Sequence, residues 1–343
     1  MNHKIYFICP TNKFASGGVK HIYRQVELLN NNGFNAVLLL KKRANQNWFS
    51  SKVPVQLSPY IFKKLKYQYS NKKMNIFRKL TLSFLKMFSV KLEKDAILVF
   101  PEIYGPKIHQ IEMGMKKVIF NQNCYYTFDH FSLFQDMQET PYLHKDTAAI
   151  IVCSQDAQDY LENTFPTATT FRMRLGIDSE IFSYSENKKR QIAFMPRKLS
   201  DDVLQVINIL HVRGKLKKWR FLPIENKTEK EVADIMKESA VFLSFNHKEG
   251  FGLPPAEAMS CGCYVVGYCG QGGKEYFKPE FSTSVADGDI ISFVKSVESV
   301  CEQIEQNSLF QNKGKLASDF ITENYSVKNE ETDVVSIWKD ILK

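Results

Sequence analysis

Short apolar runs alternate with segments of helical periodicity along the first half of the chain. A run at 5–9 is followed by a glycine pair and then by apolar residues that recur at helical spacing up to position 29. Further apolar runs of strand length lie at 36–40, 97–100, 118–120 and 149–152. Strands that alternate with helices in this way predict a parallel sheet covered by helices on both faces.

A second series of the same kind begins after a hydrophilic run at 185–190, which we interpret as a linker. Strands are expected at 192–195, 219–222, 240–245 and 264–268, and helices at 201–210, 228–238, 290–305 and 309–324. Thr228 and Glu231 form a capping box at the start of the second of these helices. An apolar stripe between positions 327 and 342 predicts a last helix. The chain is therefore expected to contain two consecutive α/β domains.

Residues 249–262, which read EGFGLPPAEAMSCG, carry the strongest chemical signal of the chain. Gly250 and Gly252 allow a tight turn after the preceding strand. The two prolines that follow fit the first turn of a helix, whose unpaired N–H groups and positive dipole end suit a phosphate. Glu249 and Glu257 flank the turn and can accept hydrogen bonds from sugar or ribose hydroxyls. The pattern predicts a nucleotide-sugar site.

This string resembles the E-x7-E signature of family 4 glycosyltransferases, which are retaining enzymes of the GT-B fold. The resemblance is strong over residues 190–280 and only topological over the first domain. It implies an α/β protein of two Rossmann-like, doubly wound domains that face each other across a cleft. An acceptor-binding domain would span 1–185 and a nucleotide-sugar donor domain 186–325, and a C-terminal helix at 326–343 would cross back to the first domain.

The same resemblance assigns roles within the string. It implies that Glu249 lies against the donor sugar and takes part in catalysis, and that Glu257 holds the ribose. The backbone of Phe251, Gly252 and Leu253 would reach the sugar and the phosphate.

Arg197 and Lys198 directly follow the first strand of the second domain, where doubly wound sheets bind their ligands. Two cations there would neutralise a nucleotide diphosphate and stabilise its charge as the sugar–phosphate bond breaks. Family 4 enzymes place an Arg after this strand and a Lys several residues later, so Arg197 matches the pattern and Lys198 departs from it. Solvated loop charge is the alternative for both.

Two glycine segments are expected beside the donor. Gly17 and Gly18 lie between the first strand and the first helix, and in the family such a pair lies beside the donor phosphate and the acceptor. Gly272 and Gly273 belong to a loop after the strand at 264–268, which resembles the glycine loop of the family near the donor.

The acceptor side is expected in two loops of the first domain. One loop carries Glu102, which either accepts a hydrogen bond from the acceptor hydroxyl or caps a helix. The other carries Asn121 and Gln122, close to a place where many family members have a His that contacts the sugar.

No metal and no cofactor are expected beyond the nucleotide-sugar substrate. Asp287 and Asp289 match an Asp-x-Asp metal motif, but an apolar-periodic run follows them, so we interpret Asp289 as a helix N-cap. The seven cysteines are scattered and several lie within apolar runs, which indicates reduced, buried thiols in a cytoplasmic protein.

The net charge of +9 is unevenly distributed along the chain. The segment 62–94 contains ten Lys or Arg residues and one acid, Glu93, with apolar and aromatic residues between them. It is either an amphipathic element that rests on an anionic membrane or a helical insertion with solvated lysines. No nucleic-acid motif accompanies the charge, and no apolar run approaches the roughly 20 residues that span a bilayer. The expected location is the cytoplasm, with peripheral attachment to the inner face of the cell membrane if the segment binds lipid.

Together these features predict a retaining, metal-independent glycosyltransferase that moves a sugar from a nucleoside diphosphate to an acceptor hydroxyl. The expected setting is bacterial polysaccharide or lipid-linked glycan assembly. The alternatives are a nucleotide-sugar epimerase of the same fold, a catalytically silent partner subunit and a membrane-bound scaffold. Arg197, Glu249 and Glu257 are all present, which argues against a silent subunit.

Overall fold

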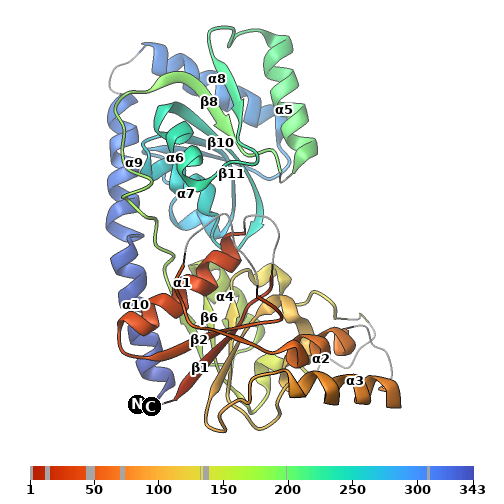
Figure 1. Cartoon of the computed structure of the whole chain (residues 1–343). Coiled ribbons are helices and arrows are strands. Elements are labelled where there is room, and N and C mark those ends of the chain that lie inside the picture. Colours follow the sequence, from red (N-terminus) through yellow and green to blue (C-terminus); the bar gives the residue numbers. More distant parts are fainter. Residues whose placement is uncertain are drawn as a thin grey trace. The chain divides into compact units, whose positions relative to one another are not determined.

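The chain forms two compact units, seen in the computed structural model of Figure 1. The first unit comprises residues 1–153, 157–173 and 331–343, and the second comprises 154–156 and 174–330. The structure describes residues 3–11, 16–43, 51–69, 74–131, 133, 139–197, 199–306 and 310–343.

The division of the chain differs in detail from the boundaries expected from the sequence. The chain passes from the first unit to the second after Met173, and it returns after Glu330. The sequence suggested a passage after residue 185, at the hydrophilic run, and a return after residue 325.

The strands of the first unit run parallel in one sheet, in the order β3-β2-β1-β4-β5-β6-β7. They are β1 (Lys4–Ile8), β2 (Asn35–Leu40), β3 (Val55–Leu57), β4 (Ile97–Pro101), β5 (Lys117–Asn121), β6 (Thr147–Val152) and β7 (Thr170–Arg172). The strand order reverses between β1 and β4, which is the switch point of a doubly wound sheet. The apolar pattern does not predict β3, because this strand is short and its first residue is exposed.

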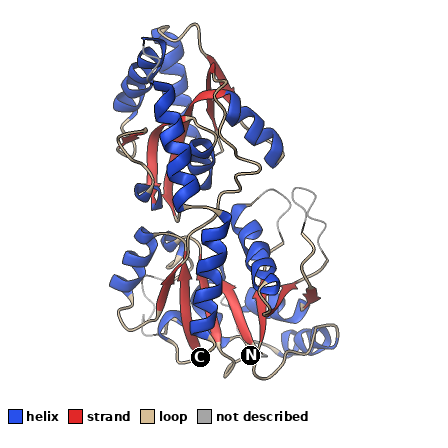
Figure 2. Ribbon diagram, turned by 90° about the vertical axis from the view of Figure 1, so that its left-hand side faces the viewer, coloured by secondary structure: helices blue, strands red, loops and turns tan. Residues whose placement is uncertain are grey.

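Helices cover both faces of this sheet (Figure 2). They are α1 (Gly17–Asn31), α2 (Pro59–Tyr69), α3 (Ile76–Met87), α4 (Gln155–Thr164) and part of α10 (Val327–Ile341), with shorter turns η1 (Glu102–Gln110), η2 (Cys124–Tyr126) and η3 (Pro141–Leu143). Successive residues of a strand point to opposite faces. Accordingly Tyr6 packs in a cluster with Ile61 and Leu65 of α2, whereas the ring of Phe7 lies 5.9 Å from that of Trp338 in α10.

The sheet of the second unit is also parallel, in the order β12-β11-β10-β8-β9. Its strands are β8 (Lys189–Phe194), β9 (Arg220–Pro223), β10 (Ser239–Glu249), β11 (Tyr264–Gln271) and β12 (Ser282–Val285). The sequence did not predict β12, because three of its four residues are Ser or Thr. Val241, Leu243 and Phe245 of β10 share one core cluster, which also includes Val206 and Phe293 from two helices.

The helices of the second unit follow the predicted periodicity. They are α5 (Ser200–Arg213), α6 (Glu229–Glu238), α7 (Leu253–Ser260), α8 (Ile290–Gln306) and α9 (Phe310–Asn324), with a short turn η4 (Gly272–Glu275). The capping box of α6 is confirmed: Thr228 Oγ1 accepts the backbone N–H of Glu231 at 3.3 Å, and Glu231 Oε2 accepts that of Thr228 at 2.8 Å. In α5, by contrast, the N-cap is Leu199 and no side chain caps the helix.

The last helix, α10, begins in the second unit and ends in the first. Glu330 is fully buried, and its Oε2 accepts the backbone N–H of Gly176 at 3.1 Å within the second unit. Trp338, further along the helix and also fully buried, packs on the sheet of the first unit.

All seven cysteines are buried thiols. In the described part of the chain, no helix combines the length and the apolar character that crossing a bilayer requires.

Candidate functional site

Strand β10 carries the first residues of the candidate donor site at its carboxyl end. It is buried as far as Asn246, and its register with β11 shifts between Asn246 and Glu249. Within this irregularity Lys248 has a positive φ of 47°. A bulge at a strand end changes the direction in which side chains point. Here it places Glu249, half-buried, opposite Gln271 at the carboxyl end of the sheet.

Helix α7 begins directly after this turn. Its N-cap is Gly252, with φ 86° and ψ 73°, a conformation that residues with a Cβ adopt only with strain. Positive φ falls on Gly252 and not on Gly250, so only one of the two glycines adopts the left-handed conformation. Pro254 and Pro255 lie in the first turn, as expected. The first N–H groups of a helix have no intrahelical partner, and together with the dipole they favour an anion.

The glycine loop after β11 packs directly on this turn. A Cβ on Gly272 would lie 2.2 Å from the carbonyl oxygen of Gly250, and one on Gly270 would lie 2.7 Å from Cβ of Asn246. Gly273 is buried as well. These approaches are too close for any side chain at Gly272, so the loop and the turn form one close-packed structure. Two glycine segments that the sequence presents separately thus meet in space.

Tyr276 fixes the same turn, and the sequence analysis did not identify it. Its fully buried hydroxyl lies 3.0 Å from the carbonyl oxygen of Phe251 and 2.5 Å from that of Gly252, and donates to them. Burial raises the pKa of this phenol well above its usual range, so it remains a donor. The ring of Phe251 packs between Tyr276 and Tyr325, at centroid distances of 5.1 and 5.2 Å. The side chain of Phe251 therefore belongs to the core, and its backbone forms the turn.

Asn246 is a second residue that the sequence analysis missed. Its side chain is 7% exposed, and its Nδ2 has no hydrogen-bond partner within the described structure. A Cβ on Gly252 would lie 2.4 Å from this nitrogen. The sequence signal that could have identified Asn246 is a polar residue at the end of a buried strand. Parallel sheets bind their ligands at the carboxyl ends of such strands.

The charged residues predicted for the donor site lie at the same end of the sheet. Glu257 is half-buried and is the fifth residue of α7, so it lies in the second turn of that helix. Leu253 is the first residue of that helix. Arg197 is exposed in the segment after β8, the strand that pairs with β10. Lys198 lies outside the described residues.

The two aspartates of the Asp-x-Asp string have partners within the protein. Asp289 Oδ1 accepts the backbone N–H of Ser292 at 2.9 Å, and its hydrogen bonds to Ser292 lower the pKa of its carboxyl group. This confirms Asp289 as the N-cap of α8. Asp287 Oδ2 lies 3.1 Å from Nδ1 of His247. Among the described residues no group of three or more His, Cys, Asp or Glu side chains is arranged to hold a metal ion.

In the first unit, the structure joins the glycine pair to the loop after β5. Helix α1 begins at Gly17, and the side chain of Ser16 makes no capping hydrogen bond. A Cβ on Gly18 would lie 3.0 Å from Oε1 of Gln122. The start of α1 and the predicted acceptor-side loop are therefore neighbours at the carboxyl end of this sheet.

Glu102 connects the loop after β4 to the loop after β5. Its carboxylate, 4% exposed, accepts the backbone N–H of Gln122 at 3.0 Å. Burial raises its pKa to about 7, although hydrogen bonds from backbone N–H groups partly oppose this shift. A carboxyl group with such a pKa suits proton transfer near neutral pH, and its bond to Gln122 is structural at the same time.

Asn121 differs from its expected role. It is fully buried, and its Nδ2 donates to Thr127 Oγ1 at 2.9 Å and to Tyr142 Oη at 2.8 Å. Through its amide nitrogen Asn121 supports the loop that carries Gln122, whereas its Oδ1 has no hydrogen-bond partner within the described structure.

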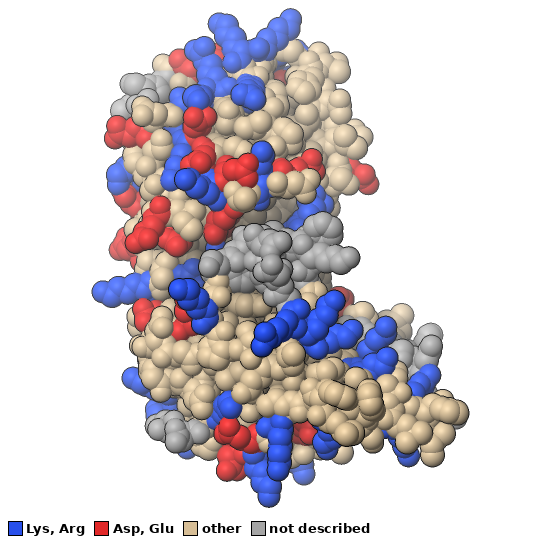
Figure 3. Space-filling view, viewed as in Figure 1, with Lys and Arg blue, Asp and Glu red and all other residues tan. Residues whose placement is uncertain are grey.

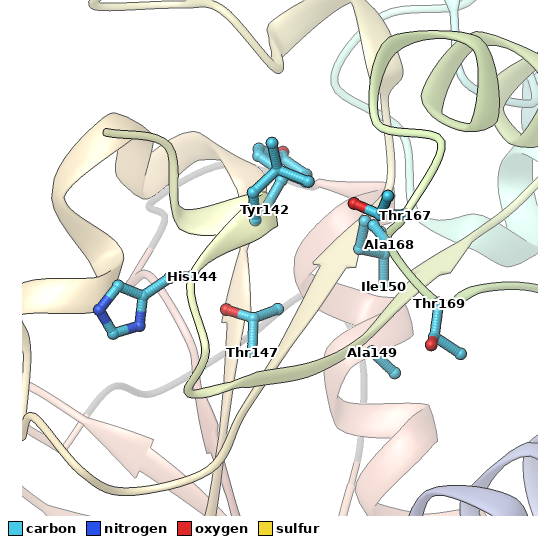
Figure 4. A pocket seen from close by; sticks show the side chains of 9 residues that line it. Tyr142, His144, Thr147, Ala149, Ile150, Thr167, Ala168 and Thr169 are labelled. Atoms are coloured by element: carbon cyan, nitrogen blue, oxygen red, sulfur yellow. The ribbon is translucent and has the colours of Figure 1, made fainter. Parts of the chain in front are cut away.

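A small pocket of about 120 Å³ in the first unit is lined in part by Tyr142, whose hydroxyl accepts from Asn121 (Figure 4). Among its lining residues are His144, Thr147, Thr167 and Thr169. Thr147 begins β6 and Thr169 immediately precedes β7, so the pocket lies at the amino ends of these strands. The predicted site residues that the structure describes lie at the carboxyl ends of strands or in the segments that follow them.

Two parallel α/β units with switch-point topology define the fold class, and comparison with solved structures identifies it as GT-B. Sucrose-phosphate synthase from Thermosynechococcus elongatus has a TM-score of 0.66 at 11% identity, covering 99% of both chains. The pneumococcal O-GlcNAc transferase GtfA, solved in complex with UDP and GlcNAc, has a TM-score of 0.65 at 11% identity, again covering 99% of both chains. At such identities the likeness establishes the fold alone.

A match to a family model adds evidence on the activity. Residues 206–317 match the model described as "Glycosyl transferases group 1". An α-1,6-glucosyltransferase of Actinobacillus pleuropneumoniae serotype 7 (strain AP76) is 24% identical over 265 residues, which cover 74% of this chain and 77% of that protein. These matches support a glycosyltransferase activity for the chain.

Proposed function

We propose that this protein is a retaining, metal-independent glycosyltransferase of family 4, which transfers a sugar from a nucleoside diphosphate to an acceptor hydroxyl. The acceptor would be a growing glycan or a lipid-linked glycan in bacterial polysaccharide assembly. The observation that carries the proposal is the close-packed turn of the second unit. Glu249, the start of α7 and the loop at Gly272 meet there at the carboxyl end of the sheet.

The chemistry of this turn suits a nucleotide sugar. The N–H groups at the start of α7 favour a diphosphate. Glu249 and Glu257, both half-buried, flank the turn and can accept hydrogen bonds from sugar and ribose hydroxyls. UDP is the first nucleotide to test, because the structurally similar GtfA was solved with UDP.

The proposed reaction needs no protein nucleophile. The acceptor oxygen attacks the anomeric carbon from the face on which the diphosphate leaves. The bond between the anomeric carbon and the phosphate oxygen breaks, the bond to the acceptor oxygen forms, and the acceptor proton moves to the leaving phosphate oxygen. Arg197 would stabilise the charge that develops on the diphosphate, and positioning would supply much of the remaining rate.

Calorimetric titration of nucleoside diphosphates and substitution of Glu257 test the donor site. Glu257→Ala should weaken binding of the correct nucleotide by at least about tenfold, since a hydrogen bond to a charged group contributes roughly 1.5–3 kcal/mol. Glu280→Ala, which removes an exposed carboxylate elsewhere in the same unit, is the matched control and should leave affinity unchanged. Equal affinity of wild type and Glu257→Ala would contradict the assigned ribose contact.

Turnover measurements test Arg197 and the metal requirement. Arg197→Ala should lower kcat by roughly 100-fold, because the charge it stabilises is greatest as the bond breaks. Arg220→Ala, at the opposite end of the sheet, serves as the control. A change in KM alone would mean that Arg197 contributes only uniform binding.

Three observations on the reaction complete the test. Activity should survive a chelator, and NMR of the product should show the donor's anomeric configuration. A strict Mg²⁺ or Mn²⁺ requirement would contradict metal independence. A donor that is epimerised without any acceptor would indicate the epimerase alternative.

A further inference from the structure

Helix α3 of the first unit has an apolar face that the described residues of this unit leave exposed. The helix has no buried residue. Six of its apolar side chains, counting one just after its end, are between 60% and 80% exposed: Ile76, Phe77, Leu80, Phe84, Met87 and Phe88. Their spacing of three, four and seven to eight positions puts them on one side of the helix.

The opposite side of α3 attaches the helix to the fold. Leu82 and Leu85 are partly buried there, and α3 packs on α2, whose Leu65 belongs to the core of the unit. The chain after α3 is tied to the start of α2, since Ser89 Oγ accepts the backbone N–H of Tyr60 at 3.1 Å. The outward orientation of the apolar face is therefore a property of the folded unit.

This concentration of apolar surface is unusual for a surface helix. An ordinary surface helix presents polar residues to water, and contiguous exposed apolar patches mark interaction sites. Many of the exposed large hydrophobic residues in the described structure lie between Met74 and Phe88. The face is thus a localised feature and not the scatter of single apolar residues that any surface shows.

The charges around the face select its partner. Lys79 and Lys86 are exposed on α3, Lys66 on α2, and Lys91 shortly after α3. The only acid between positions 62 and 94 is Glu93, which pairs with Lys4 at 3.1 Å. In Figure 3 the projection in the region of α3 consists mostly of uncharged residues, with Lys and Arg side chains along it.

An apolar face bordered by lysines fits an anionic bilayer better than a protein. Interfacial helices combine these two features, because the apolar residues enter the headgroup boundary while the cations meet the lipid phosphates. Protein interfaces, by contrast, are depleted of Lys. Pairing with a second copy of the chain would also bring two lysine-rich surfaces together.

We propose that α3 docks this protein on an anionic lipid surface, with its apolar face in the headgroup–acyl boundary and the surrounding lysines against the lipid phosphates. The proposal stands on the first unit alone and is independent of the donor chemistry assigned to the second.

Co-sedimentation of the full chain with vesicles tests the apolar part. The vesicles contain phosphatidylglycerol and phosphatidylcholine in equal amounts, or phosphatidylcholine alone. The variant Phe77→Ser/Leu80→Ser/Phe84→Ser should bind the anionic vesicles at least about tenfold more weakly than wild type. Its thermal stability should be close to that of wild type, because the three side chains are exposed. The matched control Leu204→Ser/Val212→Ser changes two exposed apolar residues of α5 and should bind as wild type does.

A second variant tests the electrostatic part. Lys66→Gln/Lys79→Gln/Lys91→Gln should also lose at least about tenfold in binding, since each lysine near such a surface contributes a several-fold factor. Wild-type binding should fall as salt is raised, because screening shortens the range of these charges to about 8 Å at physiological ionic strength. The control Lys217→Gln/Lys218→Gln/Lys230→Gln removes the same charge from exposed positions of the second unit and should keep binding.

Three results would overturn the proposal. The first is equal binding to neutral and anionic vesicles, or binding to neither. The second is unchanged binding of the α3 variant. The third is a dimer in sedimentation velocity that the α3 variant converts to monomer without lipid, because that result would assign the face to a second copy of the chain.

Discussion

The carboxyl ends of the two sheets are built by different means. In the second unit, backbone packs on backbone: Gly272 lies so close to the carbonyl of Gly250 that no side chain fits. In the first unit, polar side chains hold the loops, as when Glu102 accepts the N–H of Gln122. Gly18 in the first unit meets only the end of the Gln122 side chain. The carboxyl end of the second sheet is therefore shaped by steric exclusion in addition to the buried hydrogen bonds of Tyr276, whereas that of the first sheet relies on buried hydrogen bonds.

The carboxylates at the carboxyl ends of the two sheets differ accordingly. Glu102 is almost fully buried, and its pKa rises to about 7. Glu249 and Glu257 remain half-buried beside the glycine turn. The second unit thus offers carboxylates to a ligand, whereas the first uses a carboxylate mainly within its own structure. This difference can be tested by substitutions that should have unequal effects at the carboxyl ends of the two sheets.

The largest effect is expected at Gly272. In Gly272→Ala the new Cβ would lie 2.2 Å from a backbone oxygen, which cannot move without displacing the turn. Overpacking of this kind costs about 3 kcal/mol. Chemical denaturation should show that loss, and nucleotide affinity should fall with it. A Gly272→Ala protein as stable as wild type would mean that steric exclusion does not shape the carboxyl end of this sheet.

Glu102→Gln should have the next largest effect, and the effect should depend on pH. A carboxyl group with a raised folded-state pKa contributes stability at low pH and loses it as pH rises. The loss runs from the ordinary pKa of a glutamate, 4.5, to the folded-state pKa of about 7. Gln does not titrate, so the free energy of unfolding of the variant should rise relative to that of wild type across this window, by up to roughly 3 kcal/mol above pH 7. The same difference at pH 4 and pH 8 in denaturation experiments would contradict the burial of a titrating carboxyl group.

Tyr276→Phe should have a smaller effect on stability. The change removes a buried hydroxyl that donates to the carbonyl groups of Phe251 and Gly252, which costs about 1–2 kcal/mol. Because those carbonyls belong to the turn, nucleotide affinity should fall as well. Tyr264→Phe, which removes a hydroxyl bonded to Thr283 elsewhere in the unit, should lower stability without changing affinity.

The smallest effect is expected for Gly18→Ala in the first unit. The new Cβ would meet only the flexible end of Gln122, at 3.0 Å, and Ala favours a helix relative to Gly. We expect the free energy of unfolding to change by less than about 1 kcal/mol. If Gly18→Ala lowered the free energy of unfolding as much as Gly272→Ala does, the carboxyl ends of the two sheets would not differ in the way described above.

The sequence alone predicted the two α/β units, most of their strands and the capping box of α6. These features depend on the periodicity of apolar residues and on local chemistry, which act over a few neighbouring positions. The strands β3 and β12 escaped prediction because β3 has only three residues and β12 consists mostly of Ser and Thr. The pairing of both strands depends on a neighbouring strand.

The donor-site string was also recognisable in the sequence, because glycine and proline each allow particular backbone conformations wherever they occur. The structure alone decided which residues support it. Tyr276 and Asn246 contact the turn through tertiary packing, and no local pattern distinguishes them. Asn121 likewise looked like a loop amide and is enclosed by Thr127 and Tyr142. Apolar spacing determines elements locally, whereas the partner of a buried polar group is set by chain segments that only folding brings together.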